Sequence, residues 1–467
     1  MDMEEKKYDA GSFRDPDGRI FYYRESVFRQ FNEKGYKEFL VFFENNLCQK
    51  LMEEGVFIKT FLTDEFPDGK TVRHEKISFI SYPYEWSPFM LRDAGLLVLD
   101  LQIRLLENGY SLKDATPYNI QFVKGKPVWI DVASVEKWDG KPAWVGYSQF
   151  CGFFLYPLLF YKYLNLEPHK ILFADFEGVD FKKALSVLPF CAKINPSLFF
   201  DVGLPNILRK FIKEDVSRKV IESRNKNQPY AKEIQLRNLR RLRKIIATLA
   251  KPKKSMWSQY HESDICNYSE SALKQKEEFV KACLRESRCE AILDVGANTG
   301  FYSRVAANVL PDARIVSIDN DIESINELYR VTEGKNILSL VLDLTNPSPA
   351  IGWKLAERKS FLERANFDCV MALAVIHHLR VSKNIPMREI AELFSKITSR
   401  FLIVEFVGKG DKMFKKLTSL REDTFGDYTV SSFENVFSDF FTLKKKTELD
   451  GGTRFLYFYE RKKNSSL

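Results

Sequence analysis

The stretch Ala291–Gly300, AILDVGANTG, constrains the fold of this 467-residue chain more than any other segment. Its apolar run up to Val295 predicts a short parallel strand that is buried on both faces. Gly296 and Gly300 predict a tight turn that opens a helix and lets the backbone approach a ligand with no Cβ in the way. A strand, a glycine turn and a helix in this order indicate a nucleotide-binding α/β unit.

Acidic residues end the next two predicted strands. Asp319 ends ARIVSID, nineteen residues after Gly300, the usual distance to a carboxylate that accepts hydrogen bonds from a ribose. Asp343 follows a third apolar strand in VLDLTN, where a carboxylate can meet an adenine amino group. A dehydrogenase could carry the same features, so the later strands have to decide.

The later strands favour another fold class. FDCVMALAVIHHL (Phe367–Leu379) predicts a fourth strand with a His-His-Leu exit, and RFLIVEF (Arg400–Phe406) predicts a fifth. The Asp-Gly-Gly between FTLKKK and TRFLYFYERK predicts a terminal antiparallel hairpin. In this order the set resembles the class I S-adenosylmethionine-dependent methyltransferases. The resemblance covers about Lys274–Lys463 and implies a Rossmann-like α/β sheet of seven strands.

This resemblance implies S-adenosylmethionine as the cofactor and also implies its binding residues. The glycine turn would cradle the methionine portion, with Asp294 near its amino group. Asp319 would accept from the ribose hydroxyls, Asn320 would lie by the adenine, and Asp343 would contact the adenine edge. The expected cofactor-binding residues are Asp294, Gly296, Ala297, Asn298, Gly300, Asp319, Asn320, Asp343 and Leu344.

His377 and Glu405 are the candidate catalytic residues. The methyl sulfonium is already a good electrophile, so the protein's main tasks are positioning and desolvation, but a hydroxyl acceptor also needs a base. His377, with its neighbour His378, follows the fourth strand and is the first candidate base; the alternative is a structural turn. Glu405, at the end of the fifth strand, is the second, and could equally hold Lys409 or Lys412.

The segment Asn346–Arg364 is the expected lid over the pocket. It contains Trp353, and its cations Lys354, Arg358 and Lys359 would suit an acidic acceptor. The fourth strand does not end in the Asn/Asp-Pro-Pro-aromatic loop that grips adenine or glutamine amides. This argues against amino-methylation of adenine in nucleic acids.

A second constellation lies in Leu112–Glu136. Asp114 and Asn119 are separated by four residues, and Asp131 ends the second strand of a predicted hairpin. The pattern resembles the catalytic loop and metal-binding aspartate of protein-kinase-like phosphotransferases. That resemblance implies Asp114 as the base, and Asn119 and Asp131 as ligands of the magnesium that accompanies ATP. The histidine, the Phe-Gly pair and the glycine-rich loop of that family are absent. The alternative is that Asp114 caps a turn and that Asn119 forms hydrogen bonds with backbone groups.

Coarser patterns predict the remaining N-terminal elements. GSFRDPDGRIFYYRESVFRQ predicts a hairpin with its turn at DPDG, and KISFISY (Lys76–Tyr82) predicts a strand. Helical spacing predicts helices over Lys37–Glu54 and Met90–Asn108.

Motifs along most of residues 12–460 resemble bacterial methyltransferases of a nodulation-protein-like group. FRDPDGRIF, ISYPYEWSPFMLRDAGLL, DVGANTG, ALAVIHHL and VEFVGKGDKM carry this resemblance. Such proteins couple this kind of N-terminal region to a C-terminal methyltransferase domain. We therefore expect an α+β kinase-like domain over residues 1–165, a helical connector over 166–256 and a class I methyltransferase domain over 257–467.

The net charge of +8 is concentrated in Ile234–Lys254, which holds eight cations and no acid. Leu239, Leu242 and Ile246 predict an amphipathic helix there. Its basic face is either solvated or attracted to an anionic partner. A hydrophobic content of 45% supports packed cores, and seven scattered cysteines favour a reducing compartment. No stretch is apolar enough to span a bilayer, so we expect a cytoplasmic protein.

Together these features predict methyl transfer from S-adenosylmethionine to an oxygen of a small molecule or glycan. The first alternative is a bifunctional kinase–methyltransferase that acts on a sugar or glycan. The others are an RNA methyltransferase and a non-enzymatic binding protein that keeps the nucleotide fold. Nucleic acid is the least expected partner, because no RNA-binding module is recognisable.

Overall fold

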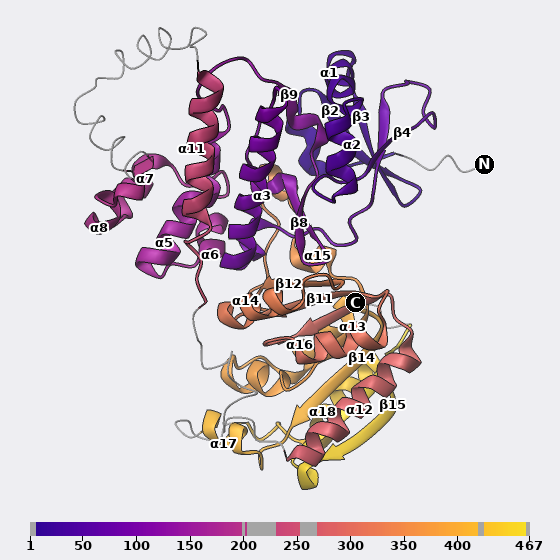
Figure 1. Cartoon of the computed structure of the whole chain (residues 1–467). Coiled ribbons are helices and arrows are strands. Elements are labelled where there is room, and N and C mark those ends of the chain that lie inside the picture. Colours follow the sequence, from indigo (N-terminus) through magenta and orange to yellow (C-terminus); the bar gives the residue numbers. More distant parts are fainter. Residues whose placement is uncertain (1–5, 199–200, 203–229, 253–268, 419–424, 464–467) are drawn as a thin grey trace. The chain divides into compact units, whose positions relative to one another are not determined.

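A computed structural model describes residues 6–198, 201–202, 230–252, 269–418 and 425–463 (Figure 1). The chain forms two compact units. The N-terminal unit comprises Met1–Lys251 with Ala356–Arg358, and the C-terminal unit comprises Pro252–Leu355 with Lys359–Leu467. The helix expected in the connector belongs to the N-terminal unit. Within the described ranges, we find no helix with the length and apolar character needed to cross a membrane.

The C-terminal unit is built on a seven-stranded sheet of order β12-β11-β10-β13-β14-β16-β15. The strands are β10 (Ala291–Val295), β11 (Arg314–Asp319), β12 (Ile337–Val341), β13 (Phe367–Ala372), β14 (Thr398–Val407), β15 (Phe441–Leu449) and β16 (Arg454–Arg461). Strands β10 to β14 pair in parallel, whereas β16 is antiparallel to both of its neighbours. The predicted class I methyltransferase sheet with its terminal hairpin is therefore confirmed.

Helices cover both faces of this sheet. They are α12 (Glu270–Ser287), α13 (Phe301–Val309), α14 (Ile322–Val331), α15 (Phe361–Arg364), α16 (Met387–Ile397), α17 (Lys412–Thr418) and α18 (Val430–Phe440). Alternate residues of β16 point to opposite faces: Leu456 belongs to the core cluster that includes Val280 of α12, whereas the Tyr457 ring lies 5.0 Å from that of Phe433 in α18. This two-sided burial explains why the strands read as apolar runs.

The N-terminal unit begins with an antiparallel sheet of order β1-β2-β3-β5-β4. Its strands are β1 (Lys7–Tyr8), β2 (Gly18–Tyr23), β3 (Ser26–Phe31), β4 (Thr60–Leu62) and β5 (Thr71–His74). Helices α1 (Glu33–Phe43) and α2 (Asn46–Glu53) lie between β3 and β4 in the sequence. Phe21, Phe28 and Phe66 form a small buried aromatic cluster on this sheet.

The rest of the N-terminal unit is mostly helical. The long helix α3 (Pro88–Glu107) leads into β6 (Tyr110–Leu112), which pairs with β9 (Val135–Lys137) and encloses the hairpin β7 (Ile120–Val123) and β8 (Lys126–Trp129). The later helices are α4 (Tyr147–Phe150), α5 (Tyr156–Leu164), α6 (Pro168–Ala174), α7 (Phe181–Val187), α8 (Phe190–Lys193) and α11 (Ala231–Ile246). Helix α11 packs on α3.

Three local predictions in this unit are wrong. Lys76–Tyr82 is not a strand, because the Gln121 side chain accepts the backbone N–H of Ser81 at 2.9 Å. The hairpin turns at Arg24–Glu25, with φ of 45° and 62°, and not at DPDG. The single helix expected over Lys37–Glu54 is two, because Asn45 caps a new helix through the N–H of Leu47.

Candidate active site

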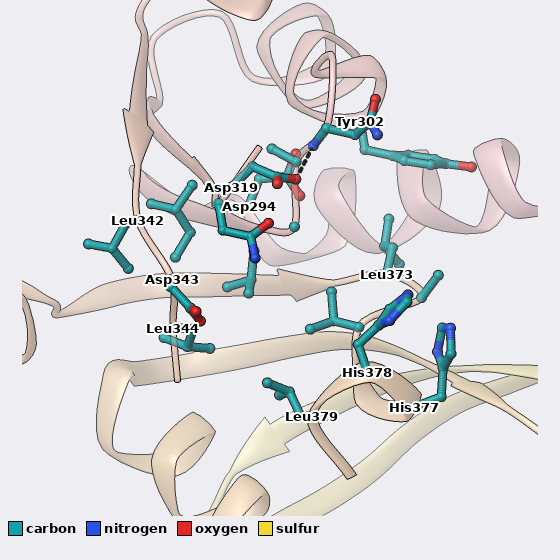
Figure 2. Close-up of a pocket in the computed structure, with 18 of the residues that line it drawn as sticks. Asp294, Tyr302, Asp319, Leu342, Asp343, Leu344, Leu373, His377, His378 and Leu379 are labelled. Atoms are coloured by element: carbon teal, nitrogen blue, oxygen red, sulfur yellow. Dashed lines mark hydrogen bonds between the residues drawn. The ribbon is translucent and has the colours of Figure 1, made fainter. Parts of the chain in front are cut away.

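A cavity of about 320 Å³ lies where the strands β10 to β13 end, in the C-terminal unit (Figure 2). Its wall includes the ends of these four strands together with residues of α12 and α13. The sequence-predicted residues in the wall are Asp294, Gly296, Ala297, Asn298, Asp319, Asn320, Asp343, Leu344 and His377. The structure therefore brings together eight of the nine expected cofactor residues and the first candidate base.

The two glycines of the turn have different tasks. Gly296 has a φ of +68° and lines the cavity, and a Cβ there would lie 2.8 Å from a methyl group of Val375. Gly300 has a φ of +77° and is absent from the cavity wall, and a Cβ there would lie 2.0 Å from Leu328 Cδ1. Gly300 thus allows helix α14 to pack closely, which is a structural role and not the ligand approach expected from the sequence.

Asp319 connects the glycine turn to the second strand. Its Oδ2 accepts the N–H of Asn298 at 2.8 Å, and its Oδ1 accepts the N–H of Asp321 at 2.9 Å. Burial raises the pKa of Asp319. Each carboxylate oxygen has two lone pairs, so these bonds leave acceptor capacity for ribose hydroxyls.

Asp294 is almost fully buried beneath the turn, with 3% of its surface exposed. The Ser303 hydroxyl donates to Asp294 Oδ2 at 2.6 Å and lies 2.8 Å from the Ser317 hydroxyl. Burial raises the pKa of Asp294 to about 7. A cationic ligand group at this position would favour the ionised carboxylate.

Asp343 and the histidine pair occupy different sides of the cavity. In Figure 2, Asp343 and Leu344 lie on one side, His377 and His378 on the other. Asp343 is held by the backbone N–H of Thr345 at 2.9 Å and by Lys383 at 3.3 Å. The separation suits a ligand with an adenine at one end and a reacting group at the other.

His377 is a buried polar side chain of the cavity wall. It is 3% exposed, and its Nδ1 has no hydrogen-bond partner among the described residues. Burial, His378, Arg454 and Lys276 together hold the pKa of His377 well below its usual value. The imidazole is therefore neutral, with a nitrogen able to accept a hydrogen bond.

Glu405 does not line the cavity, and its partners differ from those expected. Lys276 Nζ lies 2.7 Å from Oε2, and Arg454 lies 3.1 Å from Oε1; Asp411 binds the same arginine at 2.8 Å. Lys409 and Lys412 do not take this place. Because both oxygens face buried cations, the geometry gives Glu405 a positioning role in place of the role of base.

Sequence reasoning missed Lys276, Tyr302 and Arg454, which also line the cavity. A signal for Lys276 was present: it lies between Ala272 and Val280 at four-residue spacing, on the buried face of α12. A lysine inside an apolar helical stripe needs a buried partner, and so it marks a site. No comparable pattern surrounds Arg454.

The expected lid does not supply cations to the cavity. None of Trp353, Lys354, Arg358 and Lys359 is in its wall, and Ala356–Arg358 belong to the N-terminal unit. The expectation that these cations favour an acidic acceptor therefore loses its basis.

In the N-terminal unit, an arginine occupies the second constellation. Arg29 of β3 lies 2.7 Å from Asp131 Oδ1 and 3.4 Å from Asp15, and Asn119 Nδ2 donates to Asp131 Oδ2 at 3.5 Å. Burial and the Asp131 carboxylate raise the pKa of Asp114, so Asp114 and Asp131 are within electrostatic reach. The structure brings Asp114, Asn119 and Asp131 together, as the motif predicts.

The same residues do not fit a magnesium ion. Arg29 already neutralises Asp131, and Asn119 presents a donor nitrogen to it. Within the described ranges, no group of three or more His, Cys, Asp or Glu side chains is suited to hold a metal. The constellation therefore does not support the expected magnesium and ATP.

The basic face of α11 is paired with acids of its own unit. Arg240 lies 2.8 Å from Glu107, Arg241 lies 2.6 Å from Asp201, and Arg243 pairs with Asp100. Lys253 and Lys254 of the predicted tract lie outside the described residues. Neighbouring carboxylates thus compensate three of the eight cations that suggested an anionic partner.

Comparison with known proteins places the chain in a family. No model of a known protein family matches it. Nodulation protein NoeA of Rhizobium meliloti (strain 1021) is 31% identical over 468 residues, which cover 97% of this chain and 96% of NoeA. The chain belongs to the NoeA family. With the class I sheet, this family membership identifies an S-adenosylmethionine-dependent methyltransferase of the nodulation-protein-like group.

Similar solved structures lie at lower identity. The N-methyltransferase NodS of Bradyrhizobium japonicum WM9 is 13% identical to this NoeA-family chain, covering 41% of it and 98% of NodS with a TM-score of 0.31. A putative O-methyltransferase of Nostoc punctiforme PCC 73102 is 15% identical, covering 44% of this chain and 60% of its own with a TM-score of 0.32.

Proposed function

We propose that the enzyme transfers a methyl group from S-adenosylmethionine to a hydroxyl oxygen of an uncharged small molecule or glycan. The observation that carries this proposal is His377, a buried neutral imidazole of the cavity wall whose Nδ1 has no hydrogen-bond partner among the described residues. A hydroxyl is a poor nucleophile unless a neighbouring base accepts its proton. A soft or anionic acceptor would not need such a base.

The residues at the strand ends fit the cofactor. Asp294 would meet the amino group of its methionine portion, Asp319 the ribose hydroxyls, and Asp343 the adenine edge. When bound, S-adenosylmethionine supplies a methyl group on a sulfonium, and the C–S electron pair returns to sulfur as the methyl leaves.

His377 would take the hydroxyl proton at Nδ1 while the acceptor oxygen forms its bond to the methyl carbon. The pocket disfavours an imidazolium, because burial and the nearby cations oppose it. During methyl transfer, however, His377 would gain a positive charge as the bound cofactor gives one up. The total charge of the pocket would be unchanged. Proton uptake by His377 would therefore be favoured when it coincides with methyl transfer.

An uncharged acceptor agrees with the charges around His377. The two cations that help to lower its pKa, Arg454 and Lys276, are balanced by Glu405 and Asp411 within the protein. An anionic acceptor would have to compete with these buried carboxylates, at a cost in desolvation.

For the N-terminal unit we propose a kinase-like fold that has lost phosphotransfer. The order β6, Asp114, Asn119, the β7–β8 hairpin and Asp131 supports the fold. The Arg29–Asp131 pair supports the loss of metal-dependent chemistry.

Methyl transfer to neutral oligosaccharides tests the proposal. The purified full chain is incubated with S-adenosylmethionine and a panel of free and pre-O-methylated sugars, and S-adenosylhomocysteine and methyl ethers are measured. His377→Asn should keep cofactor binding and lower the transfer rate by roughly 10²–10⁴-fold, the range for a lost general base. His378→Asn is the matched neighbour and should cost much less. Methylation of amines alone, or full activity in His377→Asn, would contradict the proposal.

A further inference from the structure

A buried lysine faces the cofactor cavity from helix α12. The side chain of Lys276 is 5% exposed, it belongs to the cavity wall, and its Nζ lies 4.9 Å from the ring centroid of Tyr302. Removing an ammonium from water is costly unless a counter-charge is fixed nearby. Here the counter-charge is Glu405, which is itself completely buried.

The described wall contains three cations, Lys276, Lys383 and Arg454. Lys383 binds Asp343, which lies across the cavity from the histidine pair. The side chain of Arg454 is 1% exposed, and its guanidinium is held by Glu405 and Asp411. An ammonium has three N–H donors, so Lys276 can serve Glu405 and a ligand oxygen together.

Lys276 lies within electrostatic reach of Asp294. Burial raises the pKa of Asp294, and the positive charge of Lys276 acts in the opposite direction. Both side chains line the cavity, one from α12 and the other from β10. An acid and a cation arranged in this way are complementary to a free amino acid, which carries an ammonium and a carboxylate on one carbon.

S-adenosylmethionine ends in such an amino acid. We propose that Lys276 binds its α-carboxylate while Asp294 binds its ammonium, and that Glu405, Arg454 and Asp411 are positioning residues that hold Lys276 at the wall. The inference rests on the proposed function, since it concerns the cofactor of the same cavity. It gives the four buried charges of this network a task in cofactor recognition.

Ligands that differ in one group test the inference. S-adenosylhomocysteine, its decarboxylated analogue and methylthioadenosine are titrated calorimetrically against the full chain. The unmodified protein should bind S-adenosylhomocysteine about 10- to 100-fold more tightly than the decarboxylated analogue, the usual effect of one charge-assisted hydrogen bond. Lys276→Met should remove this discrimination and leave methylthioadenosine binding within about twofold.

Two further variants separate a contact from a structural effect. Lys274→Met lies two residues away on the same helix, where the Lys274 side chain is 75% exposed and pairs with Glu270. It should retain the full discrimination. Lys276→Arg keeps the positive charge and should retain part of the discrimination between the two ligands. Glu405→Gln should reduce this discrimination although Lys276 is present.

The two possible failures are distinguishable. Equal weakening of all three ligands in Lys276→Met, with Lys276→Arg no better, would assign Lys276 to folding and overturn the inference. Unchanged discrimination in Lys276→Met would overturn it as well. If the unmodified protein binds none of the three ligands, the proposed function fails instead.

Discussion

The C-terminal cavity and the N-terminal constellation both collect carboxylates at the ends of strands, but the partners of these carboxylates differ. Asp294 and His377 line the cavity, and the Nδ1 of His377 has no hydrogen-bond partner among the described residues. In the constellation, Asp131 lies 2.7 Å from Arg29. The comparison teaches that a motif specifies residue types, whereas the partners of those residues decide whether they can serve a ligand.

The energetics of the two regions should differ in the same way. A buried carboxylate without a cation destabilises the ligand-free protein, and this cost is recovered when a ligand binds. A buried ion pair instead holds the fold together, and removal of one partner leaves an uncompensated charge. Variants of the two regions should therefore separate binding from stability.

The largest expected effect is on stability in the N-terminal unit. Arg29→Met should lower its free energy of unfolding by roughly 2–4 kcal/mol, because Asp131 is 18% exposed and would lose its counter-charge. Denaturant titration of the full chain measures this. Arg19→Met on the neighbouring strand, where Arg19 is exposed, should change it by less than ~0.5 kcal/mol. Magnesium–ATP binding by the unmodified protein would contradict the conclusion that the N-terminal constellation does not serve a ligand.

The next effect is on binding in the C-terminal unit. Asp294→Asn should weaken S-adenosylmethionine by about 10- to 100-fold, because the amide cannot neutralise the ligand's ammonium. The same variant should raise the melting temperature of the ligand-free protein at pH 8, because it removes a buried charge. A variant that loses both binding and stability would show that Asp294 is structural. Calorimetry and thermal unfolding on one sample give both quantities.

The pH dependence sharpens this point. Asp294 has a folded-state pKa of about 7, raised from 3.8, so its contribution to folding stability falls as pH rises through this interval. Cofactor affinity should move oppositely and rise by up to about tenfold between pH 6 and 8, because the ammonium prefers the ionised carboxylate. Burial also raises the pKa of Asp319, so ionisation of Asp319 likewise lowers the folding stability as the pH rises. Asp294→Asn should flatten most of the profile.

The smallest effect concerns helix α11. Arg240→Gln should change the free energy of unfolding by no more than ~1 kcal/mol, because the Arg240–Glu107 pair is exposed to solvent. It should also leave retention on heparin unchanged at moderate salt. A marked loss of retention would show that the basic face serves an anionic partner after all.

Much of the C-terminal unit could be predicted from sequence, because its signals are local. A strand buried on both faces is a continuous apolar run, and the ligand edge of a parallel sheet is where each run ends. Asp294, Asp319 and Asp343 were found in this way. The role of Gly300 was misjudged, since its close neighbour Leu328 belongs to the following helix.

What could not be predicted depends on partners that are distant in the sequence. Glu405 is a candidate base in the sequence, or a partner of nearby lysines, but its partners Lys276 and Arg454 lie 129 and 49 residues away along the chain. Lys76–Tyr82 has strand propensity, but Gln121 bonds to its backbone at Ser81. In both cases tertiary contacts override the local pattern.

The C-terminal hairpin has a consequence for the order in which the parts of the cofactor pocket form during synthesis. Arg454, the first residue of β16, is among the last parts of the cavity wall to leave the ribosome. Until it arrives, Glu405 and Asp411 lack the cation that joins them, and Lys276 lacks a fixed anchor. Chains are synthesised from the N-terminus, so the first strand and its glycine turn exist long before a complete cofactor pocket. A nascent chain should acquire its ligand only after β16 has emerged.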